Sequence, residues 1–355
     1  MRIRFLTATP LDFQRGSGTY MGIQVLGRAL ESLGHEVSYE TPRTGLPLFT
    51  AERLLFNRQL RPDPRFDMTV GFDMDGYRIA AAAGPYVAAL KGVIADELRF
   101  EAGLTRLTMG MQARCERQQV HRAPRVLVTS RYSAERVREL YGLAAMPAIV
   151  PEPIDLAEWR RLLDRHPGSA RQFTVLFVGR HYRRKRVDML LRAASLLAGS
   201  LPSLEVRIVG NGPCTAQWRK LARTLRLEET VRWLGDISRD ELAAEYSRAD
   251  LLCLPSVQEG FGIVLLEAMA AGTAIVAARA GAIPEVVPQA TLVDPDSAEA
   301  LAEGIATLSR SPEARAAQAA AGTVRVAEFD APRVARAFLV AIGDSQAAAA
   351  TSPRP

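Results

Sequence analysis

Two glutamates lie eight positions apart in the run PSVQEGFGIVLLEAMAAG, which spans residues 255–272. Glu259 precedes a glycine-rich turn, and Glu267 lies two turns along a helix predicted from about Ile263. At about 1.5 Å of rise per residue, the carboxylates are on the order of 10 Å apart, too far to share one water molecule. They suit an elongated ligand with hydroxyls at both ends and phosphate between them, as in a nucleotide sugar. The alternative is that Glu259 is a loop charge and Glu267 a solvated helix residue.

The start of the same helix could bind an anion. Gly260 and Gly262 flank Phe261 and let the backbone approach a ligand closely. The free N–H groups of a helix that begins near Ile263 attract negative charge, and the helix dipole strengthens the attraction. A phosphate-binding helix start between the two glutamates is therefore the prediction.

A bound diphosphate also needs cations, and the loop after the strand-like run FTVLFVG (173–179) supplies them. This loop has the sequence RHYRRKR, in which Arg180 follows the strand end and Lys185 precedes the next helix. We expect these two side chains to neutralise phosphate, whereas Arg183, Arg184 and Arg186 face solvent or an anionic surface. The alternatives are a solvated basic face and a nucleic-acid patch. Limited aromatic interleaving and the absence of a nucleic-acid-binding motif argue against the patch, so we expect no nucleic-acid partner.

Two further glycine-containing turns follow strand-like runs. In GNGP (210–213), Gly210 and Asn211 permit a turn against a flat ligand, although a purely structural turn explains the pattern equally well. In RGSGTY (15–20), Gly16 and Gly18 could approach a phosphate or a sugar. The next glycine comes one residue too late for the GxGxxG spacing, which argues against a nicotinamide cofactor.

The elements that must position these residues alternate between strand and helix patterns, as in a parallel sheet. The alternation stops around residues 147–171, where four prolines occur, and then begins again. We therefore predict an α/β protein with two doubly wound sheets, whose ligands bind at the carboxyl ends of the strands in a cleft between domains. The predicted parts are an acceptor-binding domain at 1–155, a linker at 156–172, a donor-binding domain at 173–330, a helix at 331–346 that could return to the first domain, and a flexible tail at 347–355.

Composition agrees with an ordinary globular protein. The 355 residues are 48% hydrophobic and 24% charged, which predicts two folded domains and little disorder. The start MRIRFLTATP lacks a signal-peptide core, and no long apolar run is present, so we expect a cytoplasmic protein. Three cysteines show no metal-ligand spacing. A net charge of +6 favours an anionic partner and is compatible with peripheral contact at the inner face of a membrane.

These motifs together resemble the retaining glycosyltransferases of family 4, which have the two-domain GT-B fold. The resemblance rests on VGRHYRRKRVDMLL, GNGP, ADLLCLPSVQEGFGIVLLEAMAAGTAIVAARAGAIPEVV and LVDPDSAEALAEGI, and it is dense over residues 173–307. It implies two Rossmann-like domains that face each other across a cleft. It also implies transfer of a sugar, with retention, from a nucleotide-diphosphate sugar to an acceptor hydroxyl.

The resemblance also implies roles for single residues. Glu259 would contact the donor sugar, Glu267 the nucleotide ribose, and Arg180 and Lys185 the diphosphate. The backbone from Gly260 to Ile263 would contact the donor as well.

The acceptor side departs from the family, whose members commonly carry a histidine after a strand of the amino-terminal domain. The corresponding stretch here, GVIADELRFE, offers Asp96 and Glu97 instead. We take Asp96 as the candidate that positions or deprotonates the acceptor hydroxyl, and Glu97 as an acceptor contact. An Asp just after a strand is also a common helix cap.

A second pair of carboxylates, Asp73 and Asp75 in GFDMDGYR, has the DxD pattern that elsewhere binds a divalent metal beside a nucleotide sugar. We interpret them as acceptor contacts or turn formers, because arginine and lysine already cover the diphosphate. The prediction is an enzyme without a metal site or cofactor, with the nucleotide sugar as co-substrate. The alternatives are a nucleotide-sugar-binding protein without transfer activity and a nucleotide-sugar epimerase.

Overall fold

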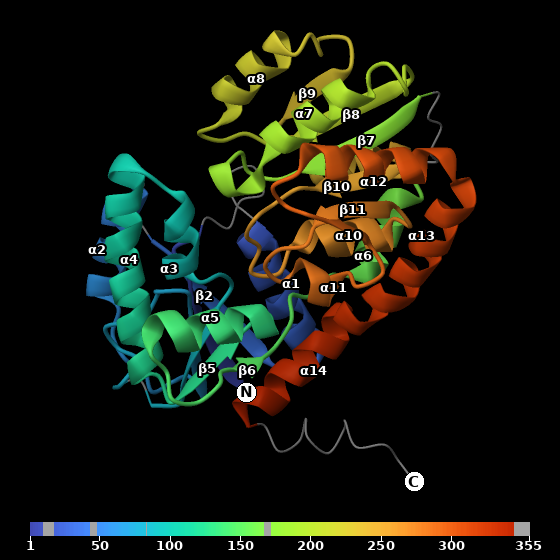
Figure 1. Ribbon diagram of the computed structural model, residues 1–355. Coiled ribbons are helices and arrows are strands. Elements are labelled where there is room, and N and C mark those ends of the chain that lie inside the picture. Colours follow the sequence, from blue (N-terminus) through green and yellow to red (C-terminus); the bar gives the residue numbers. More distant parts are fainter. Residues whose placement is uncertain (10–17, 43–47, 83, 167–171, 344–355) are drawn as a thin grey trace. The chain divides into compact units, whose positions relative to one another are not determined.

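A computed structural model describes residues 1–9, 18–42, 48–82, 84–166 and 172–343 (Figure 1). The chain forms two units. The amino-terminal unit contains Met1–Pro153 and the last segment from Phe329, and the carboxy-terminal unit contains Ile154–Glu328.

The amino-terminal unit is built on a six-stranded parallel sheet with the order β2-β1-β3-β4-β5-β6. The strands are β1 (Arg2–Leu6), β2 (Glu36–Glu40), β3 (Met68–Phe72), β4 (Tyr86–Leu90), β5 (Arg125–Val128) and β6 (Ala148–Ile149). The helices are α1 (Gly18–Ser32), α2 (Phe49–Gln59), α3 (Ile94–Glu97), the 3-10 turn η1 (Leu98–Phe100), α4 (Gly103–Arg122), α5 (Arg131–Tyr141) and α14 (Ala331–Ile342). Strands β3 and β4 are buried throughout, as expected when helices cover both faces of a parallel sheet.

Successive side chains of a strand point to opposite faces of the sheet, so the core of this unit has one part on each face. Val87 and Ala89 of β4 pack into one cluster with α1 and α14, whereas Tyr86 and Ala88 pack with α2 on the other face. Helix α14 arrives from the end of the chain and packs against α1, so this sheet face is completed by residues distant in sequence.

The carboxy-terminal unit is built on a second six-stranded parallel sheet with the order β12-β11-β10-β7-β8-β9. The strands are β7 (Phe173–Val178), β8 (Leu204–Val209), β9 (Val231–Gly235), β10 (Leu251–Leu254), β11 (Ala274–Ala278) and β12 (Thr291–Val293). The helices are α6 (Leu156–Leu163), η2 (Arg183–Lys185), α7 (Val187–Leu197), α8 (Thr215–Thr224), α9 (Arg239–Arg248), α10 (Ile263–Ala270), α11 (Ile283–Val286), α12 (Ala298–Arg310), α13 (Pro312–Val326) and η3 (Ala327–Phe329), whose last residue begins the returning segment.

The structure corrects the predicted linker at 156–172. Residues 156–163 form helix α6, which packs against α9 and α10 inside the carboxy-terminal unit. Trp159 anchors it, because this side chain is fully buried and its indole N–H donates to the Glu267 carbonyl at 3.1 Å. The prolines on both sides of this segment favoured a linker in the sequence interpretation, whereas tertiary packing stabilises a helix there. The predicted tail at 347–355 lies outside the described residues.

Each sheet has one place where the chain reverses its direction of travel across the strands. This switch point lies between β1 and β3 in the first sheet and between β7 and β10 in the second. In open α/β sheets, ligands bind beyond the carboxyl ends of the strands at such a point. The topology therefore predicts a ligand beyond the carboxyl ends of the strands at each of the two switch points. Within the described residues, no helix has the length and apolar character needed to span a bilayer.

A buried histidine belongs to the core of the carboxy-terminal unit. The ring of His181 packs against Trp218 and Trp233, with centroid distances of 5.3 and 5.9 Å. Its Nδ1 contacts the Thr215 hydroxyl at 2.7 Å, and Nε2 has no hydrogen-bond partner among the described residues. Burial lowers the pKa of His181 from 6.5 to about 4, because the imidazolium cannot be solvated there.

We expect His181 to make the unfolding free energy of this unit depend on pH. Because the pKa is lower in the folded state, protons favour the unfolded chain, and stability falls as the pH decreases from about 6.5 toward 4. The shift corresponds to about 3 kcal/mol over that window. Thermal unfolding at pH 7 and pH 4.5 should show a smaller difference for His181→Asn than for the wild type, and a change at the exposed His121 should leave the difference unaltered. Equal pH slopes for wild type and His181→Asn would contradict this origin.

Candidate functional site

The switch point of the carboxy-terminal unit brings together two side chains that the sequence separates by 74 positions. Lys185 lies in the loop after β7, and Glu259 lies in the loop after β10. Lys185 Nζ and Glu259 Oε1 are 2.6 Å apart, and their side chains are 14% and 7% exposed. A nearly buried ion pair of this kind is stabilising only when its geometry is held firmly.

Glycines hold the loop after β7 in place. Gly210 has φ of +108°, and a Cβ there would lie 2.1 Å from the Gly179 carbonyl oxygen. A Cβ at Gly212 would lie 2.7 Å from the His181 nitrogen, and His181 N–H donates to the Asn211 carbonyl at 3.0 Å. The GNGP turn therefore supports the backbone that carries Arg180. Asn211 donates its side-chain amide to Asp236, and a donor contact by Gly210 or Asn211 stays a prediction.

A third loop, after β11, holds the segment with Glu259. Gly281 has φ of +56°, and a Cβ there would lie 2.7 Å from both the nitrogen and the oxygen of Glu259. Ala282 N–H donates to the Glu259 carbonyl at 3.0 Å. The sequence interpretation did not single out Gly281. A glycine three residues after the end of a buried strand was the available signal, because glycine in such a loop often allows close backbone approach.

The helix predicted from Ile263 begins where expected, as α10. Gly262 precedes it with φ of +92°, a left-handed conformation that favours glycine. Phe261 is buried. The first turn of α10 thus follows the loop that carries Glu259.

Glu267 lies inside the carboxy-terminal unit and not on a solvated helix face. It is 7% exposed and accepts a hydrogen bond from the Tyr246 hydroxyl at 3.0 Å. Burial raises the pKa of Glu267, while the charge of Arg239 and the Tyr246 hydrogen bond act in the opposite direction. Glu259 is also buried, at 6% exposed, and the alternative in which Glu267 is a solvated helix residue is wrong.

The cluster of arginines divides into paired and unpaired residues. Arg184 donates to Gln258, and Arg186 pairs with Asp188 and Asp296, so both are partly buried and held by neighbouring residues, whereas solvent or an anionic surface was expected. Arg183 is exposed. The Arg180 side chain forms no hydrogen bond or ion pair with any residue that the structure describes, so its charge is available at the switch point.

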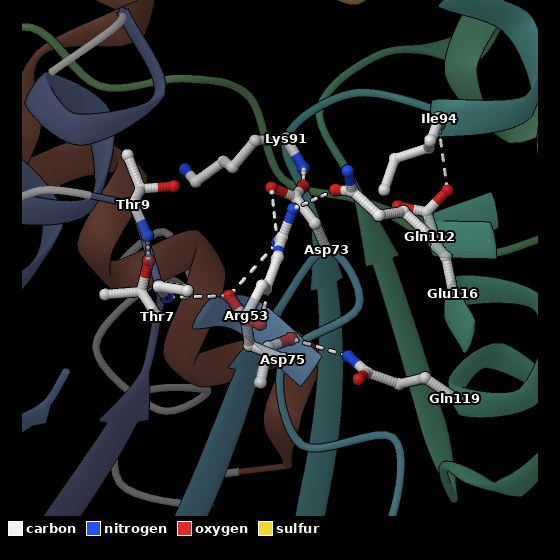
Figure 2. Close-up of polar contacts among 12 residues, drawn as sticks. Thr7, Thr9, Arg53, Asp73, Asp75, Lys91, Ile94, Gln112, Glu116 and Gln119 are labelled. Atoms are coloured by element: carbon white, nitrogen blue, oxygen red, sulfur yellow. Dashed lines mark hydrogen bonds and ion pairs between the residues drawn. The ribbon is translucent and has the colours of Figure 1, made fainter. Parts of the chain in front are cut away.

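Asp73 and Asp75 lie at the switch point of the amino-terminal unit (Figure 2). They differ in solvent exposure. Asp75 is fully buried. Its carboxylate accepts from Ala8 N–H at 2.7 Å, Arg53 Nε at 2.9 Å, Arg53 Nη2 at 3.0 Å and Asn57 Nδ2 at 3.0 Å. The prediction that Asp75 contacts an acceptor is therefore wrong, because this carboxylate joins β1 to α2.

Asp73 lies just after β3 in a left-handed conformation, with φ of +52°. One carboxylate oxygen accepts the Lys91 backbone N–H at 2.9 Å, and the other lies 3.5 Å from Arg53 Nη2. The side chain is 14% exposed, and burial raises the pKa of its carboxyl. It remains able to contact a ligand.

Asp96 occupies a different environment. It is fully buried, and its two oxygens accept from Arg99 at 3.0 Å and from the Tyr132 hydroxyl at 2.6 Å. These contacts contradict the prediction that Asp96 meets the acceptor, because both oxygens are engaged within the unit. Glu97 is partly exposed and stays a predicted acceptor contact. Gly16 lies outside the described residues, and Gly18 is the first residue of α1.

The residue that directly follows β4 is Lys91, which the sequence interpretation missed. Its Nζ lies 2.8 Å from Glu152 Oε2, and the two side chains are 7% and 3% exposed. The available signal was composition, since the chain contains only three lysines, Lys91, Lys185 and Lys220. Two of them form buried ion pairs at the two switch points.

Comparison with known proteins shows to which family the chain belongs. The model for "Glycosyl transferases group 1" matches residues 162–325. A GDP-mannose-dependent alpha-(1-6)-phosphatidylinositol monomannoside mannosyltransferase of Mycolicibacterium smegmatis is 30% identical over 261 residues, which are 68% of each chain. A D-inositol 3-phosphate glycosyltransferase of Actinosynnema mirum is 32% identical over 254 residues, 65% of this chain and 60% of that protein.

Solved structures share the fold over nearly the whole chain. Sucrose-phosphate synthase from Thermosynechococcus elongatus superposes with a TM-score of 0.79 at 21% identity, covering 99% of this chain and 100% of the other. Anabaena HepE in complex with UDP-glucose gives 0.71 at 18% identity, covering 98% and 100%. The chain therefore belongs to the glycosyl transferases group 1 family and is a glycosyltransferase with the two-unit α/β fold known as GT-B.

Proposed function

We propose that this enzyme transfers a sugar from a nucleotide-diphosphate sugar to an acceptor hydroxyl, with retention and without a metal ion. The observation that carries the proposal is the Lys185–Glu259 ion pair at the second switch point, where the loop after β7 also contains Arg180, a residue without a partner among those described. It combines a carboxylate for sugar hydroxyls with cations for the diphosphate. Retention is carried over from the resemblance to family 4.

The leaving diphosphate would gain charge as the bond to the sugar breaks. Arg180, Lys185 and the first N–H groups of α10 would stabilise that charge, and donors fixed in advance contribute most to such stabilisation. Glu259 would accept hydrogen bonds from the sugar. Glu267 would accept them from the ribose, held in position by Tyr246 and by the Trp159 contact to its backbone.

The names of similar proteins support a nucleotide-sugar donor. The mycobacterial relative is described as GDP-mannose-dependent, and HepE was crystallised with UDP-glucose. Guanine and uracil nucleotides are therefore the first donors to test.

Metal independence and the absence of a cofactor are part of the proposal. Their basis is the expectation that Arg180, Lys185 and the first N–H groups of α10 together contact the diphosphate, with Glu259 offsetting one of the two positive charges.

A panel of nucleotide sugars, followed by mass spectrometry of the products, tests the proposal. We expect transfer or slow hydrolysis of one donor, equally fast with and without EDTA. Glu267→Gln should weaken nucleotide binding about tenfold, because a hydrogen bond to a charged group contributes about 1.5–3 kcal/mol. The exposed Glu303→Gln is the matched control.

Other results of the same panel would reject parts of the proposal. Epimer formation would indicate a nucleotide-sugar epimerase, and tight binding without turnover would indicate a binding protein. Loss of activity in EDTA with recovery in manganese would reject metal independence.

Close backbone contact between Gly281 and Glu259 generates a second prediction. Gly281→Ala should lower transfer at least tenfold, because the new Cβ displaces the backbone of Glu259. Gly272→Ala is the matched control, since Gly272 also has a left-handed φ, of +67°, but no neighbour within 4 Å of its Cβ position. Both variants carry the same conformational cost, so equal transfer rates for the two would show that the contact does not position Glu259.

Peripheral membrane contact is also proposed. Leu104, Leu107 and Met111 lie on one side of α4 at helical spacing and are 69%, 64% and 43% exposed. Arg106 and Arg114 on the same helix are exposed and could meet anionic headgroups.

Sedimentation with phosphatidylglycerol vesicles tests this surface. We expect the wild type to bind and Leu107→Glu to lose binding at least fivefold. Val324, which is 77% exposed in the other unit, provides the control as Val324→Glu. Equal binding by the two variants would reject α4 as the contact surface.

A further inference from the structure

A polar cluster lines the switch point of the amino-terminal unit, and we call it the β1/β3 cluster. It consists of Thr9, Arg53, Asp73, Lys91, Gln112 and Glu116 (Figure 2). Thr9, Asp73 and Lys91 follow the carboxyl ends of β1, β3 and β4, while the others extend from α2 and α4. These positions are where the topology of the sheet predicts a ligand.

Both cations of this cluster are already neutralised. Arg53 makes a two-pronged contact with Asp75 and a further bond to Gln112 at 3.2 Å. Lys91 is paired with Glu152 at 2.8 Å. The switch-point edge of the carboxy-terminal unit differs in the pairing of its cations, because Arg180 there has no partner among the described residues.

The Lys91–Glu152 pair is enclosed by α1. A Cβ on Gly22 of that helix would lie 2.0 Å from Glu152 Oε2 and 3.4 Å from Lys91 Nζ. Helix α1 therefore packs directly over the pair, and both charges are nearly buried. Burial of an ion pair is seldom a gain over apolar packing, which favours a functional reason for these charges.

An unpartnered oxygen lies at the same place. Glu116 is fully buried, and its Oε2 accepts from Ile94 N–H at 2.9 Å and from the Tyr141 hydroxyl. Its Oε1 is buried and has no hydrogen-bond partner among the described residues. Figure 2 shows Glu116 and Gln112 reaching from α4 toward Asp73. A buried polar oxygen without a partner is costly and indicates a missing hydroxyl or water.

We infer that the β1/β3 cluster binds an uncharged polyhydroxy acceptor, a sugar or polyol, and disfavours a phosphorylated one. The inference rests on the proposed function and names the substrate class of its acceptor. With the partners Asp75 and Glu152 included, four carboxylates accompany the two cations Arg53 and Lys91, and neither of these cations is available for a phosphate. Asp73 accepts a hydrogen bond from the acceptor hydroxyl, since its side chain is 14% exposed whereas Glu116 is fully buried. A phosphate dianion at this edge would meet like charge at short range.

An acceptor panel tests the inference with the donor that the intact enzyme uses. Glucose, myo-inositol and glycerol are compared with their monophosphates by product mass spectrometry. We expect kcat/KM at least tenfold higher for a neutral acceptor than for its monophosphate. Vesicles containing glucosyl-diacylglycerol form a parallel arm, which distinguishes a lipid headgroup from a free sugar. A preference for the monophosphates would overturn the inference.

Glu152→Gln tests whether removing a carboxylate makes phosphorylated acceptors more acceptable. This change leaves the Lys91 ammonium without its counter-charge, so it should raise the ratio of phosphorylated to neutral acceptor use at least fivefold. Glu139→Gln, at an exposed ion pair on α5 of the same unit, is the control and should leave the ratio unchanged. An unchanged ratio in folded Glu152→Gln would overturn the charge argument.

Asp73→Asn tests the contact to the acceptor hydroxyl. Asparagine adopts the left-handed conformation as readily as aspartate, so the backbone should be retained. We expect at least a tenfold loss of kcat/KM for the acceptor, with nucleotide binding and donor hydrolysis unchanged. Normal acceptor use would remove Asp73 from the site.

Two outcomes for the wild-type enzyme separate this inference from the proposed function. If the wild type binds nucleotide but shows no preference between neutral and phosphorylated acceptors, this inference alone is rejected. If the folded wild type does not bind nucleotide, the proposed function is rejected.

Discussion

The switch-point edge of the carboxy-terminal unit depends on backbone segments that touch one another without intervening side chains. The loops after β7 and β8 meet through Gly210 and Gly212, and the loops after β10 and β11 meet through Gly281. Any Cβ at these positions would overlap backbone atoms. Only with these contacts can Lys185 and Glu259, far apart in sequence, form an ion pair at 2.6 Å. A nearly buried pair has little tolerance for displacement, because its attraction must offset the loss of hydration.

The two strand edges have the same topology and different charge balance. At the edge of the carboxy-terminal unit, the arginine after β7 has no partner among the residues that the structure describes. At the edge of the amino-terminal unit, Arg53 and Lys91 are each matched by carboxylates. This difference agrees with the proposal that one edge binds an anionic donor and the other a hydroxyl compound.

The amino-terminal unit has a buried charge that the sequence interpretation missed. Lys91 directly follows β4 and precedes GVIADELRFE, the stretch in which the resemblance placed the acceptor residue. A lysine alone would be an unpaired buried charge, so Glu152 from the end of the amino-terminal unit accompanies it. Asp96, which the sequence suggested, is instead occupied by Arg99 and Tyr132.

The sequence by itself determined the alternation of strands and helices and the start of α10, and it singled out Arg180, Lys185, Glu259 and Glu267 as candidates, because these follow from local pattern and spacing. The sequence could not determine which residues distant along the chain contact one another. The donors that occupy Asp75, the partner of Lys91, the contact of Gly281 with Glu259 and the burial of Glu267 all join residues distant along the chain. Helix α6 was likewise hidden, since prolines flank it and Trp159 stabilises it only through tertiary packing. Such contacts depend on which strands become neighbours, and only the folded chain decides that.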